Sequence, residues 1–226
     1  MTTTRHPVQP AQTVGELAST LPGAARVFHR HGLDFCCGGH VSLGEACAAA
    51  GLDVDSVIAE IQDEAARPGR FERWDARPLP EVIDHILEHF HEPHRRELPR
   101  LLAMARKVEE VHAQKGTCPH GLAEHVERMG EEMELHMQKE EQVLFPLLRS
   151  GQGRTAAAPI QVMEQEHREH GRNLERLREL TNDYTPPPEA CGTWNALYLG
   201  LAELERELME HIHTENNILF PRALGG

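Results

Sequence analysis

The chain has 226 residues, of which 36 are acidic and 23 basic, so its net charge is −13 with the 16 histidines neutral. A chain of this length can bury a core without disulfides, and such a negative surface repels nucleic acid phosphates and anionic lipids. Because no apolar stretch approaches a membrane span and Met1–Gln12 lacks the apolar core of a secretion signal, we predict a cytoplasmic protein.

Residues 1–66 are predicted to form a small helical domain. Thr13 and Ser42 are each followed three residues later by a glutamate, a pattern that starts helices because both side chains satisfy free backbone N–H groups. Gly51 is typical of the end of the helix that starts at Ser42. Residues 67–80 are rich in proline and arginine and are predicted to form a linker.

One motif in this domain carries reactive side chains, Asp34-Phe35-Cys36-Cys37-Gly38-Gly39. Adjacent Cα atoms are about 3.8 Å apart, less than an ordinary disulfide spans, so a bond between the two sulfurs would be strained and easily reduced. Glycine permits φ above zero, and we predict a tight loop that exposes both sulfurs as redox thiols. The alternative is a buried, inert pair. The odd number and uneven spacing of the five cysteines indicate reduced thiols without a disulfide framework.

From Glu81 onwards apolar residues recur with helical spacing, and no segment alternates with a period of two residues. Glycine and proline clusters at 116–119, 151–159 and 186–188 divide this region into four helices. We therefore predict an all-α protein in which residues 81–226 form a four-helix bundle. Several histidines and glutamates lie within the apolar stripes, where an unpaired carboxylate would be costly to bury.

The bundle is predicted from a repeated unit. The residues Glu132, His136, Glu140, Phe145 and Pro146 recur as Glu207, His211, Glu215, Phe220 and Pro221, and the upstream His91 and His94 recur as His167 and His170. Residues four positions apart lie above one another on a helix, so each His–Glu pair points to one place. If two such units pack together, their His–Glu pairs meet in the interior, and we predict that they bind a pair of metal ions there. The expected ligands are His91, His136, Glu140, His167, His211 and Glu215.

Four imidazoles and two carboxylates suit two ions. Each ion receives two imidazoles, both carboxylates can bridge, and an oxo or hydroxo bridge brings the donors to five, which leaves one position open. Nitrogen and oxygen donors without thiolate favour iron or manganese over structural zinc. The structural alternative for each His–Glu pair is an ion pair on one helix face. His94 and His170 are the rivals of His91 and His167, which lie closer to the middle of their stripes.

Three more glutamates lie near the predicted ligands. Glu132 and Glu207 each stand one helical turn before a predicted histidine ligand, and Glu166 directly precedes another. If these glutamates have a function, they would orient an imidazole, or pass protons and iron. The structural alternative is that they are acids at the solvated edge of the bundle.

With these motifs, the chain closely resembles the repair-of-iron-centres family, the iron–sulfur cluster repair di-iron proteins. The resemblance covers nearly the whole length. It is carried by the Cys36-Cys37 motif, Ile83-Asp84-His85 and the segments 136–146, 211–221 and 185–191. It implies a hemerythrin-like bundle that holds two iron ions. It assigns ligand roles to the same six residues, with Glu140 and Glu215 as bridges.

The resemblance also implies a function, the repair of iron–sulfur clusters damaged by nitric oxide or peroxide in the bacterial cytoplasm. Damaged or apo iron–sulfur proteins would be the partners, and nitric oxide or oxygen the small ligands. Two alternatives stay open: an enzyme that reduces nitric oxide to nitrous oxide at the di-iron site, and a sensor that binds oxygen or nitric oxide. The sequence also leaves open whether Cys36 and Cys37 join two chains in a homodimer.

Pro93 departs from the family pattern, in which an ordinary helix former stands at that position. Proline inside a helix removes one backbone hydrogen bond and collides with the preceding turn. We therefore predict a kink near His89 that shifts the His91 imidazole.

Overall fold

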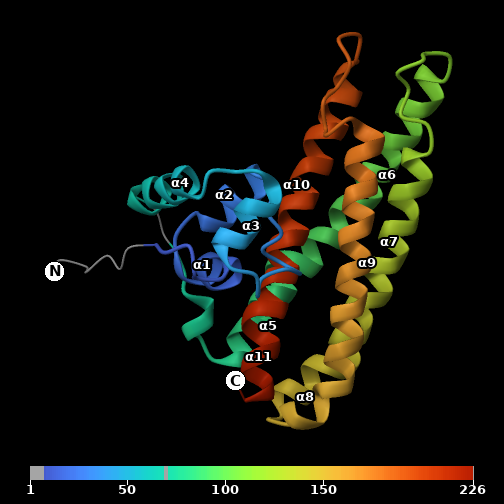
Figure 1. Ribbon diagram of the computed structural model, residues 1–226. Helices are drawn as coiled ribbons and strands as arrows, with labels where there is room; N and C mark the ends of the chain where they lie inside the picture. The colour runs from blue at the N-terminus through green and yellow to red at the C-terminus, as the bar shows by residue number, and fades with distance from the viewer. Residues whose placement is uncertain (1–7, 69–70, 226) are drawn as a thin grey trace.

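The computed structural model describes residues 8–68 and 71–225. Four long helical segments run side by side, and the smaller N-terminal helices pack against one side of them (Figure 1). Among the described residues the only β-type pairing is an isolated bridge between Thr13 and Ser42, so the predicted all-α class is confirmed. No helix in the described part of the chain is both long and apolar enough to span a membrane.

The N-terminal helices are α1 (Val14–Thr20), α2 (Ala24–Arg30), α3 (Leu43–Ala50) and α4 (Val54–Ala66). The Thr13 side chain accepts a hydrogen bond from the Glu16 N–H at the start of α1. Ser42 and Glu45 form a complete capping box at the start of α3, as predicted. Gly51 ends α3 with a φ of 68°, a conformation that favours glycine.

The bundle follows after a short 3₁₀ turn, η1 (Trp74–Ala76). Its four segments are α5 (Leu79–Ile86) with η2 (Leu87–His91) and α6 (Glu92–His112); α7 (Leu122–Lys139) with η3 (Glu140–Leu144) and α8 (Phe145–Arg149); η4 (Gly153–Ala156) with α9 (Ala157–Thr181); and α10 (Gly192–Thr214) with η5 (Glu215–Leu219) and α11 (Phe220–Leu224). Helix α6 packs on α7 and α10, and α9 packs on the same two helices, so the four close into the predicted bundle.

Three of these segments contain a π-helical turn. In η2, η3 and η5 the carbonyl of the first residue accepts a hydrogen bond from the N–H five residues later. The second residue after each turn is a proline, at positions 93, 146 and 221. A proline ring collides with the carbonyl of the residue four positions before it, and a wider turn relieves that collision. The turns contain His91, Glu140 and Glu215, so the irregular backbone coincides with three predicted ligands.

At the place of the kink predicted from Pro93, near His89, the structure has the π turn η2 (Leu87–His91). Its closing hydrogen bond runs from the Glu92 N–H to the Leu87 carbonyl. The His91 side chain at the end of this turn is completely buried in the bundle. The turn therefore aims His91 inward.

Two groups of buried apolar side chains stabilise the molecule. One runs from the N-terminal helices, including Phe28, into the part of the bundle around Trp194. The other lies at the opposite end of the bundle and includes Phe145 and Phe220. Along each of the four bundle segments the predicted ligands separate these two groups. Because the N-terminal helices and the bundle share buried contacts, the domain boundaries at residues 66 and 80 stay a prediction.

Candidate metal centre

Six side chains from the four bundle segments meet in the interior. They form two groups of four, each with ligand atoms within 4.8 Å of one another: His91, Glu140, His211 and Glu215, and His136, Glu140, His167 and Glu215. None of the six is more than 3% exposed. Both carboxylates belong to both groups. The structure thus brings together the six residues that the sequence pattern selects.

The carboxylate oxygens are shared out evenly between the histidines. Each oxygen lies near the Nε2 atom of a different histidine: Glu140 Oε2 is 3.3 Å from His91, Glu140 Oε1 3.4 Å from His136, Glu215 Oε2 3.0 Å from His167 and Glu215 Oε1 3.3 Å from His211. Donors that bind one ion at about 2.1 Å lie about 3.0 Å apart in an octahedral arrangement and about 3.4 Å apart in a tetrahedral one. The spacing suits two ions with two bridging carboxylates.

Hydrogen bonds within the protein do not account for these carboxylates. Among the described residues, none of the four oxygens of Glu140 and Glu215 has a hydrogen-bond donor, and the Nε2 atoms of His91 and His211 are also without a partner. The effective cost of removing a charged group from water is several kcal/mol. A cation placed between the oxygens and the imidazoles would offset that cost. The residues present therefore fit a metal pair better than a set of structural ion pairs.

The electrostatic field at this place is strongly negative. Burial lowers the pKa of His136, but the negative charge of Glu140 has the opposite effect and the pKa is raised to about 10. Burial disfavours the charged form of Glu215, but His211 and His167 hold the pKa of that carboxyl well below its usual value. Burial raises the pKa of Glu140 as well, but His136 and His91 bring it below its usual value. Both carboxylates are therefore ionised at neutral pH and attract a cation.

Three of the four histidines are oriented through their Nδ1 atoms. The pairs are His91 with Glu141 Oε1 at 2.7 Å, His136 with Glu166 Oε2 at 2.9 Å and His167 with Asn216 Oδ1 at 2.8 Å. A proton held on Nδ1 leaves Nε2 free to bind a metal ion. Sequence reasoning missed Glu141 and Asn216. The repeat contained the necessary signal, because each of them directly follows a carboxylate that belongs to both groups.

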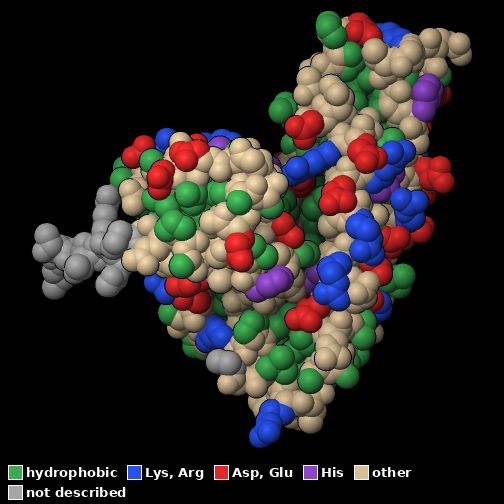
Figure 2. All heavy atoms as spheres, viewed as in Figure 1, with side chains coloured by type: hydrophobic (Ala, Val, Ile, Leu, Met, Phe, Trp, Pro, Cys, Tyr) green, Lys and Arg blue, Asp and Glu red, His purple; other side chains and the backbone are tan. Residues whose placement is uncertain are grey.

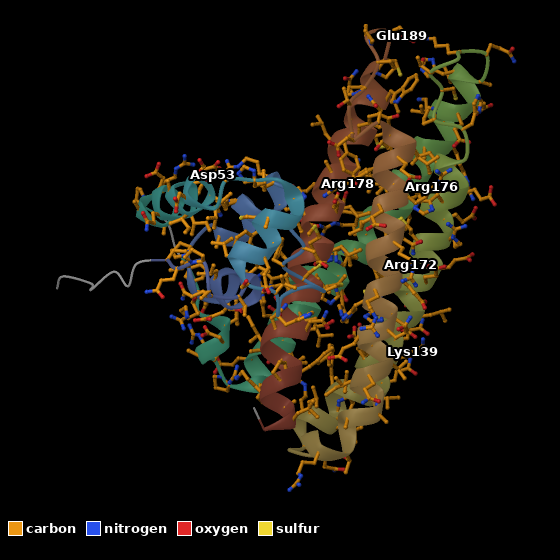
Figure 3. All side chains as sticks on the ribbon, viewed as in Figure 1. Asp53, Lys139, Arg172, Arg176, Arg178 and Glu189 are labelled. Atoms are coloured by element: carbon orange, nitrogen blue, oxygen red, sulfur yellow. The ribbon has the colours of Figure 1, made fainter. Side chains whose placement is uncertain are left out.

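Glu166 is the extra glutamate that the structure brings to the cluster. Besides His136, its carboxylate pairs with Lys139, which lies near the end of α7 (Figure 3). The hydrogen bond from His136 lowers the pKa of Glu166 to about 2. With a side chain 21% exposed, Glu166 touches both a buried histidine and solvent.

The other two glutamates lie further away. Glu132 accepts a 2.6 Å hydrogen bond from Asn173 Nδ2, and Glu207 lies 3.7 Å from Arg206. In the described part of the chain neither is hydrogen-bonded to a histidine of the cluster. Their suggested role in orienting ligands or passing iron stays a prediction.

His211 has a different environment from the other three histidines. The residue that precedes the first histidine of each unit is Glu166 in one unit and Phe90 in the other. The Phe90 ring stacks on the His211 imidazole, with centroids 5.1 Å apart and planes 15° apart. Within the described residues, His211 Nδ1 has no hydrogen-bond partner. The two halves of the centre are thus unequal: a carboxylate holds His136, and an aromatic ring holds His211.

His94 and His170 lie beside the cluster and outside both groups. The His94 ring is 5.5 Å from the ring of His211, and the His170 ring is 5.0 Å from that of His136. Burial lowers the pKa of His170 to about 3 and that of His94 well below its usual value. Both are neutral at physiological pH. The earlier histidine of each unit is the one that lies against the carboxylates.

The Cys36-Cys37 loop packs directly against the bundle beside this cluster. The Cys37 thiol donates to the carbonyl of His167 at 3.7 Å, and the Cys36 carbonyl accepts from Asn216 Nδ2 at 3.1 Å. Cys36 is only 5% exposed, whereas Cys37 is half-buried. The expectation that both sulfurs are exposed is therefore wrong for Cys36, because the loop is pressed against the bundle.

The glycines of this motif also serve a different purpose from the one expected. Neither Gly38 nor Gly39 has a positive φ. A Cβ on Gly39 would collide with the side chain of Asn217, whose amide donates to the carbonyls of Phe35 and Cys36. Gly39 thus allows close approach of the loop to the bundle, and it is this contact that buries Cys36.

Comparison with known proteins agrees with this geometry. The family model for the hemerythrin HHE cation binding domain matches residues 82–223, and a second model, ScdA_N, described as a domain of unknown function, matches residues 10–65. The chain is 48% identical over 215 residues to the iron–sulfur cluster repair protein YtfE of Pectobacterium atrosepticum, a match that covers 95% of this chain and 97% of the relative. The YtfE protein of Escherichia coli O81 is 49% identical with the same coverage.

These matches extend over both the N-terminal helices and the bundle that contains the six converging side chains. The family expected from the sequence motifs is confirmed. The chain belongs to the family of YtfE iron–sulfur cluster repair proteins, and its bundle is a hemerythrin-type cation-binding domain.

Proposed function

We propose that this chain holds two iron ions between its four histidines and two shared carboxylates and supplies iron to damaged or apo iron–sulfur proteins. One observation carries the proposal: Glu140 and Glu215 each belong to both groups of donors, and each of their four oxygens lies beside a different histidine. This arrangement suits two adjacent ions and leaves a single ion with surplus ligands. The names of the relatives, iron–sulfur cluster repair proteins, support the same class of client.

The types of donor favour release of iron to a cluster site. The six residues offer imidazole nitrogen and carboxylate oxygen and no thiolate. Iron–sulfur clusters are held by cysteine thiolates. Such thiolates retain iron more firmly than a mixture of harder oxygen and imidazole donors, so transfer from this chain to an apo-cluster protein runs towards the stronger ligands.

Glu166 supports a connection between the buried centre and solvent. Its carboxylate touches His136 and is 21% exposed, and the neighbouring Lys139 holds it in place. When His136 moves, Glu166 can offer an oxygen ligand at the edge of the bundle. Glu141 has a similar place beside His91: its carboxylate lies 2.7 Å from His91 Nδ1, is 29% exposed and is bound by Arg95. Glu166 and Glu141 are therefore the two carboxylates placed to assist exit.

The cysteines are consistent with the reducing cytoplasm that we propose as the place of action. All five are free, and the two of the Cys36-Cys37 motif lie with their sulfurs 3.9 Å apart. The hydrogen bond with the Cys37 sulfur and burial raise the pKa of the Cys36 thiol well above its usual value, so without a bound ion this residue is protonated at neutral pH. Cys37, which is half-buried, is the more accessible thiol.

Reactivation of a client enzyme tests the proposal. An iron–sulfur dehydratase inactivated by nitric oxide is incubated anaerobically with the iron-loaded protein, or with the same amount of ferrous salt. We expect the protein to restore activity faster than the salt, because the iron is delivered from a bound state. The Glu203→Gln protein, changed at a carboxylate that is 58% exposed and lies outside both groups of donors, serves as a control with an intact cluster.

Two results would contradict iron supply. One is equal reactivation by the ferrous salt. The other is no reactivation, together with catalytic release of nitrous oxide when nitric oxide is added to the reduced protein. The second outcome would identify the chain as a nitric oxide reductase. A stable oxygen adduct without reactivation would indicate the sensor function.

A further inference from the structure

The Asp34, Cys36 and Cys37 side chains form a third group of metal-type donors, with ligand atoms within 4.8 Å of one another. The two sulfurs are 3.9 Å apart, and Asp34 Oδ1 lies 3.3 Å from Cys36 Sγ. None of the three residues belongs to the centre in the bundle.

The separation matches a shared ion. Two thiolates that bind one ion at about 2.3 Å in a tetrahedral arrangement lie about 3.8 Å apart, and a thiolate and a carboxylate oxygen lie about 3.5 Å apart. The observed distances of 3.9 and 3.3 Å are close to both values. An ordinary disulfide has sulfurs about 2.05 Å apart and Cα atoms further apart than those of adjacent residues, so a bond here would be strained. The geometry fits an ion better than a bond between the sulfurs.

The loop is also held rigidly in this arrangement. Asp34 Oδ1 accepts hydrogen bonds from the N–H groups of Cys36 and Cys37, at 3.1 and 2.8 Å. Asn216 and Asn217 donate to the carbonyl of Cys36, each at 3.1 Å. Contacts with both the motif and the bundle therefore place the three donors. A site held in place by its surroundings binds an ion without first having to order its ligands.

The three donors line a groove of about 330 Å³ between the loop and α9. Arg168 and Arg172 of α9 line the same groove, and lysine and arginine side chains follow one another along this face of the molecule (Figures 2 and 3). Two thiolates and a carboxylate carry one negative charge more than a divalent ion neutralises. The other charged side chains that line the groove are three arginines and two glutamates, so they carry one net positive charge and offset that excess: Arg168, Arg172, Arg178, Glu175 and Glu205. The groove leaves room for a fourth ligand from solution.

We propose that Asp34, Cys36 and Cys37 bind one divalent ion with an affinity for thiolate, such as ferrous iron or zinc. The fourth coordination position of this ion opens to the groove lined by Arg168 and Arg172. Thiolate donors select zinc and iron over magnesium and calcium. The site is separate from the two bundle ions and does not depend on the proposed transfer of iron to clients.

Cobalt is the probe, because charge transfer from thiolate sulfur to cobalt gives intense near-ultraviolet bands that histidine and carboxylate ligands do not produce. The reduced, iron-loaded protein is titrated anaerobically with Co²⁺. We expect these bands to saturate at one equivalent. Cys36→Ser and Cys37→Ser should abolish the two-thiolate spectrum, and Asp34→Asn should weaken binding at least about tenfold. The control Cys191→Ser removes a half-buried thiol outside the group and should bind cobalt normally.

A second measurement needs no variant, in case a substitution disturbs the fold. Alkylation of each cysteine in the wild-type protein is followed by mass spectrometry with and without Co²⁺. At ten times the Kd, we expect Cys37 to react about tenfold more slowly, while Cys191 keeps its rate. The proposal would be overturned by absence of thiolate bands, or by bands of full two-thiolate intensity in Cys36→Ser or Cys37→Ser. Unchanged affinity in Asp34→Asn or an unprotected Cys37 would also overturn it.

Discussion

Replacing Glu215 by glutamine is expected to reduce bound iron from two ions per chain to one or none. Glu215 belongs to both groups of donors, with one oxygen near His167 and the other near His211. Glutamine has the same size but lacks the charge, so one substitution weakens both positions. Changes to residues that only orient a metal ligand lower affinity about 10–100-fold, and loss of a bridging ligand should exceed that. The measurement is iron per chain after gel filtration.

The matched control for this experiment is Glu203→Gln. Glu203 lies on α10, about three helical turns before Glu215; its side chain is 58% exposed and belongs to neither group. It should therefore retain two ions. If Glu215→Gln also retains two ions after gel filtration, the carboxylate is not a bridge and the pairing of the two groups is wrong.

Removal of the metal is expected to lower the thermal stability of the whole chain. A ligand that binds only the folded state at about 1,000 times its Kd stabilises that state by about 4 kcal/mol. For a chain of this size each kcal/mol shifts the Tm by about 2–4 °C, so treatment with a chelator should lower the Tm by about 8–16 °C. Both buried carboxylates then lose the cation that compensates them. Differential scanning calorimetry provides the measurement.

A double variant separates this effect from general damage by the chelator. With glutamine in place of both Glu140 and Glu215, no buried negative charge needs a cation, and the Tm should be the same with and without chelator. A wild-type Tm that does not respond to loss of iron would show that the six residues are stabilised by one another. The ion-pair alternative would then be preferred.

The fold and the six converging side chains could be predicted because both depend on periodic patterns. Apolar residues at helical spacing define the four bundle segments, and the repeat places a histidine and a glutamate on one face of two of them. Burial of Glu140 and Glu215 follows from their positions within apolar stripes. Such a pattern is enough to place the side chains, because the helix period determines which residues share a face.

The π turns could be predicted only in part. Pro93 predicts a kink near His89, whereas the sequence pattern marks Pro146 and Pro221 only as members of the repeat. All three prolines follow a π turn, and η3 and η5 begin with the two shared carboxylates. The local sequence predicts that the helix is irregular near a proline. Whether the helix forms a kink or one wider turn there depends on the packing around it.

The Cys36-Cys37 loop could not be placed from sequence alone. Its exposure is decided by Asn216 and Asn217, which lie about 180 residues away in the chain and hold the loop against α9 and η5. Nothing periodic links these segments. Glu141 and Asn216 can be singled out in the sequence because each directly follows a shared carboxylate. Which histidine each of them bonds depends on the facing helix and cannot be predicted from the repeat.

Diffraction from crystals of the iron-loaded protein, recorded at the iron absorption edge, tests the central claim most directly. We predict two anomalous peaks about 3.5–4 Å apart, one between His91 and His211, the other between His136 and His167, with Glu140 and Glu215 spanning both. A single peak in the bundle, or iron located away from these carboxylates, would contradict the account.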